Sequence, residues 1–141
     1  MSLDWVTFEL QRRVKQSYEE VRHMLSSPAV LGAGMTMPLD AEGILVMEAP
    51  FRPAPIGYED ALHAPAVLTS VRGRRIAMVR LEITAWSSEA TALTLRPISS
   101  RPERWGARRM EQYFSLGHLG ADAIARILDE EVAARSQSAD H

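Results

Sequence analysis

Histidine is the residue type in this sequence best suited to acid–base chemistry near neutral pH. The chain has four histidines, and they are His23, His63, His118 and His141. His118 precedes Asp122 by one helical turn, a spacing at which a carboxylate can orient an imidazole as a general base. The same spacing is also typical of a solvent-exposed pair on a helix, and we expect His23 at the surface as well. The sequence therefore identifies no catalytic residue.

The sequence lacks the residues and motifs on which several other kinds of catalytic, metal or cofactor site depend. The sequence has no cysteine, which excludes disulfides, thiolate metal sites and a cysteine nucleophile. It has no His-Glu-x-x-His or paired-histidine motif and no Gly-x-Ser-x-Gly turn. The glycine-containing run LGAGM at 31–35 lacks the full nucleotide-binding pattern, so we expect a loop there. We therefore predict neither a metal site nor a cofactor.

Arginine supplies almost all of the positive charge, because only Lys15 among the 16 basic residues is a lysine. The densest basic stretch surrounds Trp105 and contains Arg101, Arg104, Arg108 and Arg109. Guanidinium groups beside an indole can bind phosphate or carboxylate, as in RNA or an anionic head group. They are also typical of a helix end that folds over a sheet edge, anchored by its tryptophan. We favour the second interpretation and expect no nucleic-acid partner, because glutamates interleave and the net charge is −2.

The first patterned stretch, residues 3–26, fits two structures. Its apolar residues recur every three or four positions, which fits one long amphipathic helix. Apolar and polar residues also alternate in its first half, which fits a half-buried strand. Ser17 and Glu20 form a capping box at which a helix can begin. We therefore predict a strand over 4–14 and a helix over 18–26.

The centre of the chain is rich in proline, with five of the eight prolines between residues 27 and 63. A strand is predicted over 43–49, whereas 50–57 fits a sheet edge or a long loop and 57–60 fits a turn that leads into another strand. Further along, apolar and polar residues alternate, as in an antiparallel meander with one solvated face, and Gly73 lies in a tight turn. The strands of this meander are predicted at 66–71, 75–86 and 90–98.

The last part of the chain, residues 99–135, is predicted to be helical. Ser100 and Glu103 form a second capping box, and Pro102 suits a first turn. The apolar stripe is broad, so we expect the helix to be covered on more than one side. Glycines in a helix interior are costly, and those at 117 and 120 favour a close approach of the sheet or a bend.

Three stretches of the sequence follow one another in an order typical of a known fold. They are a strand, short helix and proline-containing exit (FELQRRVKQSYEEVRHMLSSPAVL), a late hairpin (VRLEITAWSSEATALTLRPIS) and a terminal helix (RRMEQYFSLGHLGADAIARIL). In this order they resemble the START-like superfamily of polyketide cyclases and lipid-transfer proteins, also called SRPBCC, whose fold is the helix-grip. The superfamily is defined by shape and has no invariant catalytic motif.

The resemblance implies an α+β fold in which a curved antiparallel sheet of 5–7 strands wraps around the long C-terminal helix. The pattern accounts for five or six strands, so 50–57 either hides a further short strand or has lost one. The resemblance also implies a hydrophobic cavity between sheet and helix. Carried over to this chain, the ligand-binding residues are Val79, Leu81, Ile83, Leu93, Leu95, Tyr113, Phe114, Gly117, His118 and Ala121. Most of these residue types are equally typical of an ordinary core.

Three classes of function remain open. The first is binding of an apolar small molecule such as a lipid or a polyketide. The second is a cyclase, dehydratase or hydrolase that uses the same cavity through polar groups such as Tyr113, His118 or Arg80. The third is a protein-interaction module, for example a homodimer formed through the final helix.

The length of 141 residues suits one domain, which we predict over 1–135 with a disordered tail at 136–141. The first residues carry several charges, so no signal-peptide core is expected. No apolar run approaches the roughly 20 residues that span a bilayer. We therefore expect a cytoplasmic protein without stable membrane insertion.

Overall fold

The computed structural model describes residues 8–27, 29–54, 61–98 and 101–139. Over these residues the chain forms seven strands, two α-helices and one short 3₁₀ helix. In chain order they are β1 (Leu10–Val14), α1 (Tyr18–Leu25), β2 (Thr36–Leu39), β3 (Gly43–Met47), β4 (Arg52–Pro53), β5 (Ala61–Ser70), β6 (Arg75–Ala85), β7 (Thr91–Pro97), η2 (Pro102–Arg104) and α2 (Ala107–Ala139).

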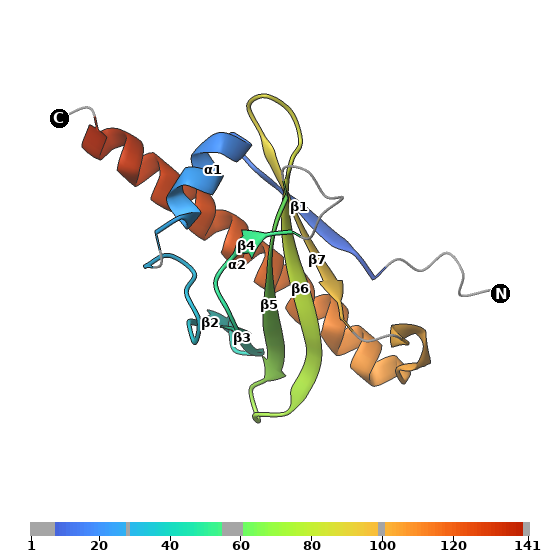
Figure 1. The fold of residues 1–141 in the computed structure, drawn as a ribbon. Helices are drawn as coiled ribbons and strands as arrows, with labels where there is room; N and C mark the ends of the chain where they lie inside the picture. Colours follow the sequence, from blue (N-terminus) through green and yellow to red (C-terminus); the bar gives the residue numbers. More distant parts are fainter. Residues whose placement is uncertain (1–7, 28, 55–60, 99–100, 140–141) are drawn as a thin grey trace.

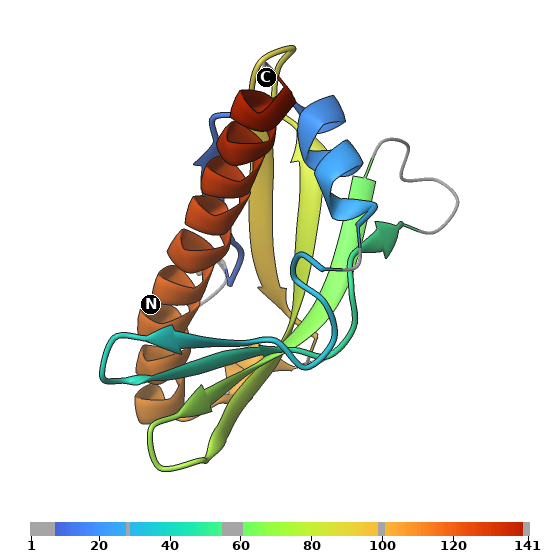
Figure 2. The same cartoon turned by 90° about the vertical axis from the view of Figure 1, so that its left-hand side faces the viewer.

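The strands form one antiparallel sheet in the order β1-β7-β6-β5-β3-β2, and β4 pairs with β5 next to β3. The sheet curls around the long helix α2 (Figure 1). Helix α2 packs against both edge strands, β1 and β2. Figure 2 shows α1 beside the C-terminal half of α2, and α1 also contacts β6. This arrangement confirms the predicted α+β helix-grip architecture, with its curved sheet and its long C-terminal helix.

The N-terminal stretch has the predicted strand and helix, not one long helix. Strand β1 covers Leu10–Val14, and the part of the predicted strand before residue 8 lies outside the described residues. Helix α1 begins at Tyr18, and the side chain of Ser17 accepts a hydrogen bond from the backbone N–H of Glu20 at 3.3 Å. The predicted cap therefore forms, because its oxygen satisfies one of the free N–H groups of the first turn.

The proline-rich centre contains two strands that were not predicted as such. Strand β2 carries Pro38 and lies at the edge of the sheet, where a missing N–H costs no ladder hydrogen bond. Strand β4 consists of two residues, Arg52 and Pro53, and pairs with β5. The stretch 50–57 therefore does contain a short strand, and the sheet reaches seven strands.

Strand β5 begins at Ala61, after the turn that was predicted to lead into a strand, and it includes the run from residue 66 that was predicted as a separate strand. Pro65 lies in the middle of β5, opposite Arg80 of β6. The backbone nitrogen and the carbonyl of one strand residue point toward the same neighbouring strand. The carbonyl of Pro65 accepts a hydrogen bond from the N–H of Glu48 at 3.0 Å, so it points away from β6. The backbone nitrogen of Pro65 therefore points to the edge of β5 where the pairing with β4 ends and the pairing with β3 begins. It does not point toward β6, so the proline removes no hydrogen bond to β6. The turn predicted at 57–60 lies outside the described residues.

The predicted meander is confirmed. Strands β6 and β7 match the predicted ranges 75–86 and 90–98 to within one residue at each end. Gly73 has a φ of +84° in the turn before β6, a conformation that glycine adopts without strain.

The C-terminal helix begins later than predicted. Residues Pro102–Arg104 form only the 3₁₀ helix η2, Trp105 is extended, and α2 starts at Ala107. Ser100 lies outside the described residues, so its predicted capping role cannot be placed. The helix continues to Ala139, beyond residue 135 at which the sequence predicts the domain to end.

Candidate functional site

The concave face of the sheet presents an apolar wall toward α2. On β6 the inward side chains are those of Val79, Leu81 and Ile83, and on β7 those of Leu93 and Leu95. Leu81 lies opposite Leu95, and Ile83 lies opposite Leu93. All five side chains are fully buried. The structure therefore brings together the five sheet residues that the sequence predicts for the ligand site.

The helix side of this interior contains the other predicted residues, with one exception. Tyr113 and Ala121 are fully buried, Gly117 is buried, and Phe114 is half-buried. His118 is exposed, so its imidazole lies at the surface of α2 and not within the interior.

Two glycines decide how closely the sheet approaches α2. A Cβ atom added at Gly117 would lie 2.5 Å from Cδ1 of Leu10, so β1 packs directly onto this helical turn. A Cβ atom added at Gly120 would lie 3.5 Å from side-chain carbons of Leu45 and Leu68, which is ordinary van der Waals distance. The interior opposite Gly120 is therefore roomier than the interior opposite Gly117.

An aromatic cluster closes one end of the interior. The ring centres of Phe8 and Phe114 lie 5.7 Å apart in a stacked arrangement. The ring centres of Trp105 and Tyr113 lie 5.2 Å apart and meet edge to face. The hydroxyl of Tyr113 donates to the backbone carbonyl of Phe8. Burial, with a smaller contribution from the negative charge of Glu9, raises the pKa of Tyr113 well above its ordinary value, so this phenol stays protonated.

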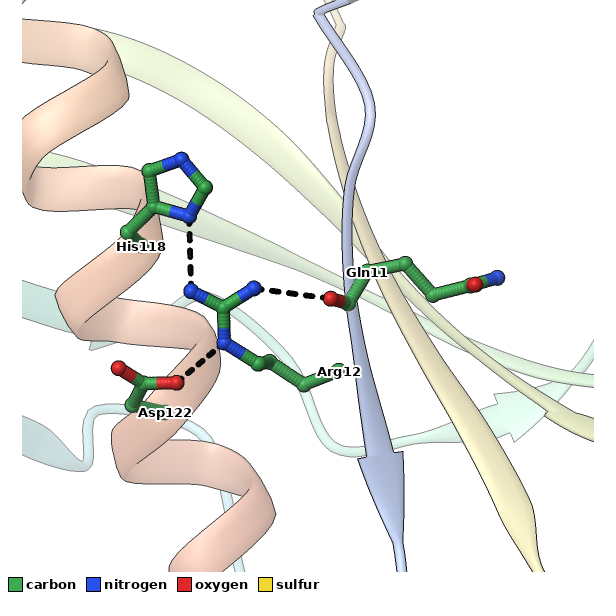
Figure 3. A network of polar contacts seen from close by, with 4 residues as sticks. All are labelled: Gln11, Arg12, His118 and Asp122. Atoms are coloured by element: carbon green, nitrogen blue, oxygen red, sulfur yellow. Dashed lines mark hydrogen bonds and ion pairs between the residues drawn. The ribbon is translucent and has the colours of Figure 1, made fainter.

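A polar network lies at the β1 edge of the same interior (Figure 3). Arg12 projects from β1 toward α2, where its Nε forms an ion pair with Asp122. One terminal nitrogen of Arg12 lies 2.8 Å from Nδ1 of His118, and the other donates to the carbonyl of Gln11 at 2.9 Å. Because arginine only donates, this contact requires a lone pair on Nδ1 and hence the His118 tautomer protonated at Nε2. His118 and Asp122 are thus joined through Arg12, not as the direct pair that their spacing suggests.

Arg12 was not predicted as a functional residue, although the sequence carries a signal for it. Leu10, Arg12 and Val14 alternate along β1, and Leu10 and Val14 are buried. A charged residue between two inward-facing apolar residues must find a partner on whatever covers the sheet. We did not draw this conclusion from the sequence.

The basic stretch around Trp105 acts as an anchor, in agreement with the favoured interpretation. Trp105 is half-buried against Phe8 and Tyr113. The guanidinium carbon of Arg109 lies 4.6 Å from the centre of the Trp105 ring, and its Nε donates to the carbonyl of Ile76 at 2.9 Å. Arg109 therefore ties the start of α2 to the end of the sheet.

These elements define a helix-grip fold, in which a curled antiparallel sheet surrounds a long C-terminal helix. The assignment rests on the strand order, the curl of the sheet and the position of α2 against both sheet edges. No protein-family model matches the sequence, and no curated protein matches it.

Solved structures with low sequence identity align over most of the chain. A conserved protein from Geobacillus kaustophilus is 16% identical over 89% of this chain and 94% of its own, with a TM-score of 0.44. A protein from Thermus thermophilus is 13% identical over 91% of this chain and 97% of its own, with a TM-score of 0.47. The Zhui aromatase/cyclase from Streptomyces sp. R1128 is 9% identical over 94% of both chains, with a TM-score of 0.35.

Among the described residues, neither helix has the length and apolar content that crossing a membrane requires.

Proposed function

We propose that this protein binds one apolar small molecule, such as a lipid or a polyketide, between the concave face of the sheet and α2. The observation that carries the proposal is the buried apolar wall of the concave face, in which Leu45 of β3, Leu68 of β5 and Leu95 of β7 face Gly120, where α2 has no side chain. A wall of this kind recognises a ligand by burial of apolar surface, which contributes roughly 25 cal/mol for each Å² removed from water.

Flexible side chains support the proposal. Met24 of α1, Met37 of β2 and Met47 of β3 are all buried and belong to the same core. Methionine is unbranched and changes rotamer at low cost, so a methionine-containing core can rearrange around a guest molecule. An apolar ligand can therefore enter this interior through movement of side chains, without loss of the sheet.

The catalytic alternative lacks a comparable observation. Of the polar groups named for it, Arg80 lies exposed on the convex face of β6 and His118 lies exposed on α2. Tyr113 does lie in the interior, but its hydroxyl donates to the Phe8 carbonyl and its raised pKa keeps it protonated. Among these groups, none is an unoccupied base that faces the apolar wall.

Titration with Nile red, an uncharged apolar dye whose emission depends on its surroundings, tests the proposal. We expect saturable binding of one dye per chain. The variant Gly120→Leu extends a side chain toward Leu45 and Leu68 and should weaken binding at least tenfold. The matched variant Gly120→Ala adds only an atom for which there is room, and it should retain binding.

Two further variants separate an interior site from surface binding and from a folding defect. Ala66→Val, on the concave face of β5, adds bulk from the opposite wall and should also weaken dye binding. Met78→Ser removes an exposed apolar side chain on the convex face of β6 and should leave dye binding unchanged. Unsaturable dye binding, or full binding by a folded Gly120→Leu or Ala66→Val variant, would overturn the proposal.

A further inference from the structure

A second candidate site lies outside the apolar interior, between β1 and the turn that joins β6 to β7. It is a hollow of about 280 Å³ lined by Gln11, Arg12, Arg13, Trp86 and Ala92. Because side chains alternate along a strand, Gln11 and Arg13 lie on the convex face of β1, away from α2. Arg13 pairs with Ala92 of β7, whose small side chain leaves the floor of the hollow open.

Arg13 and Trp86 form the chemically distinctive part of this hollow. The guanidinium carbon of Arg13 lies 4.6 Å from the centre of the Trp86 ring. Trp86 is 51% exposed, an unusual position for so large an apolar side chain. Arg13 forms no ion pair with any other residue that the structure describes. A guanidinium stacked on an indole keeps the N–H groups at its rim available to a ligand in the same plane.

We propose that this hollow binds a small aromatic carboxylate. The fork of N–H groups on Arg13 matches the two oxygens of a carboxylate and can donate to both of them. The exposed Trp86 ring offers a surface on which a planar ring can stack, at the preferred centre-to-centre range of about 4.5–7 Å. The side-chain amide of Gln11 can supply a further donor.

The charge and the size of the hollow narrow the ligand class. The residues that line the hollow include two arginines, Arg12 and Arg13, and no carboxylate, and the ion pair with Asp122 of α2 occupies Arg12 alone. The net charge of the side chains that line the hollow is therefore positive and attracts an anion. The volume is slightly below the range of about 300–1,000 Å³ that is usual for drug-sized ligands, so a single-ring acid fits better than a larger one.

Titration with benzoate, followed by tryptophan fluorescence, tests this proposal. We expect a saturable change that is lost in Trp86→Phe, which attributes the signal to this indole and not to the other tryptophans. Arg13→Gln should weaken benzoate binding at least tenfold, and Arg13→Lys should weaken it too, because lysine keeps the charge but lacks the planar fork. Arg80→Gln, which removes an exposed arginine elsewhere on the convex face, should leave binding unchanged.

The ligand class has its own controls. Inorganic phosphate should not reproduce the fluorescence change, and equal binding of phosphate would overturn the aromatic part of the proposal. Full benzoate binding by Arg13→Gln, or no saturable change with the native protein, would overturn the site itself. The Gly120→Leu variant should retain benzoate binding even where it loses Nile red, so failure of either proposal is recognised independently of the other.

Discussion

Arg12 of β1 and Asp122 of α2 lie 110 residues apart in the sequence and form an ion pair at the edge of the sheet. The pair joins the first described strand to the last helix, and His118 contacts the same guanidinium. Its side chains are 33% and 46% exposed, so water and salt screen the attraction between them. The network therefore orients β1 on α2 more than it stabilises the fold.

A double-mutant cycle on Arg12→Gln and Asp122→Asn measures this contribution. We expect a coupling of about 0.2–1 kcal/mol in the free energy of unfolding, because partly exposed ion pairs rarely contribute more. Urea unfolding of the four proteins gives the coupling, and it should shrink at high salt. A coupling of several kcal/mol that salt does not change would show that the pair is effectively buried.

Gly120→Ala should stabilise the protein. Alanine replaces glycine in the interior of α2, which favours the helix by about 0.5–1 kcal/mol, and the added atom has room beside Leu45 and Leu68. Gly117→Ala makes the same chemical change three residues earlier, where Leu10 must first move. Urea unfolding should therefore show a gain for Gly120→Ala and a smaller gain, or a loss, for Gly117→Ala.

Gly43→Ala should destabilise the protein by about 1–3 kcal/mol, the usual cost of overpacking. A Cβ atom at Gly43 would approach the backbone carbonyl oxygen of Thr69 to less than 3.0 Å, and it would also press on Leu116 of α2. A backbone atom cannot turn aside as a side chain can, so β3 and β5 would have to separate locally. Thermal unfolding checks this expectation, and an unchanged midpoint relative to the native protein would contradict it.

Tyr113 should make the protein sensitive to alkaline pH. Burial raises the pKa of Tyr113 in the folded state, whereas a tyrosine in the unfolded chain ionises near pH 10. The unfolded state therefore releases the proton first, and the contribution to stability is complete below about pH 10 and is lost as the pH rises further. The urea midpoint of the native protein should fall between pH 9 and pH 11.

The matched variant for that experiment is Tyr113→Phe. It removes the hydrogen bond to the Phe8 carbonyl, so we expect a loss of about 0.5–1.5 kcal/mol at neutral pH. It also removes the ionisable group, so its midpoint should fall less steeply above pH 10. Parallel curves for the two proteins would show that the alkaline loss has another origin.

The alternation of apolar and polar residues predicted the meander well, because its period records which side chains face the core. Val79, Leu81 and Ile83 recur at every second position, and β6 follows from that pattern almost to the residue. The same pattern predicted that these three side chains share one face of the strand, and the structure buries all three.

Two prolines lie within strands at positions that the sequence pattern alone does not locate. The backbone nitrogen of Pro65 in β5 points away from β6, so this proline removes no hydrogen bond to β6. Pro38 is tolerated in β2 because β2 is an edge. Both positions depend on neighbours that are distant in the sequence, so local reasoning had no means of locating them.

The start of the long helix and the role of His118 show the same limit. Pro102 suits a first helical turn, but Trp105 is extended and packs on Phe8, which delays α2 until Ala107. The neighbour that engages His118 is Arg12 on a different element. In each case a contact across the molecule outweighs a local preference.

The position of β1 has a consequence for how the chain folds as it is synthesised. In the sheet that the structure describes, β1 pairs only with β7, and its inward face packs on α2. During synthesis β1 leaves the ribosome before the other strands of this sheet, and α2 leaves it after all of them. The apolar side chains of Leu10 and Val14, which are buried in the folded protein, therefore lack their native contacts until the rest of the sheet and the helix have been synthesised. The last contacts of β1 to form during synthesis are therefore those that join the two ends of the described chain.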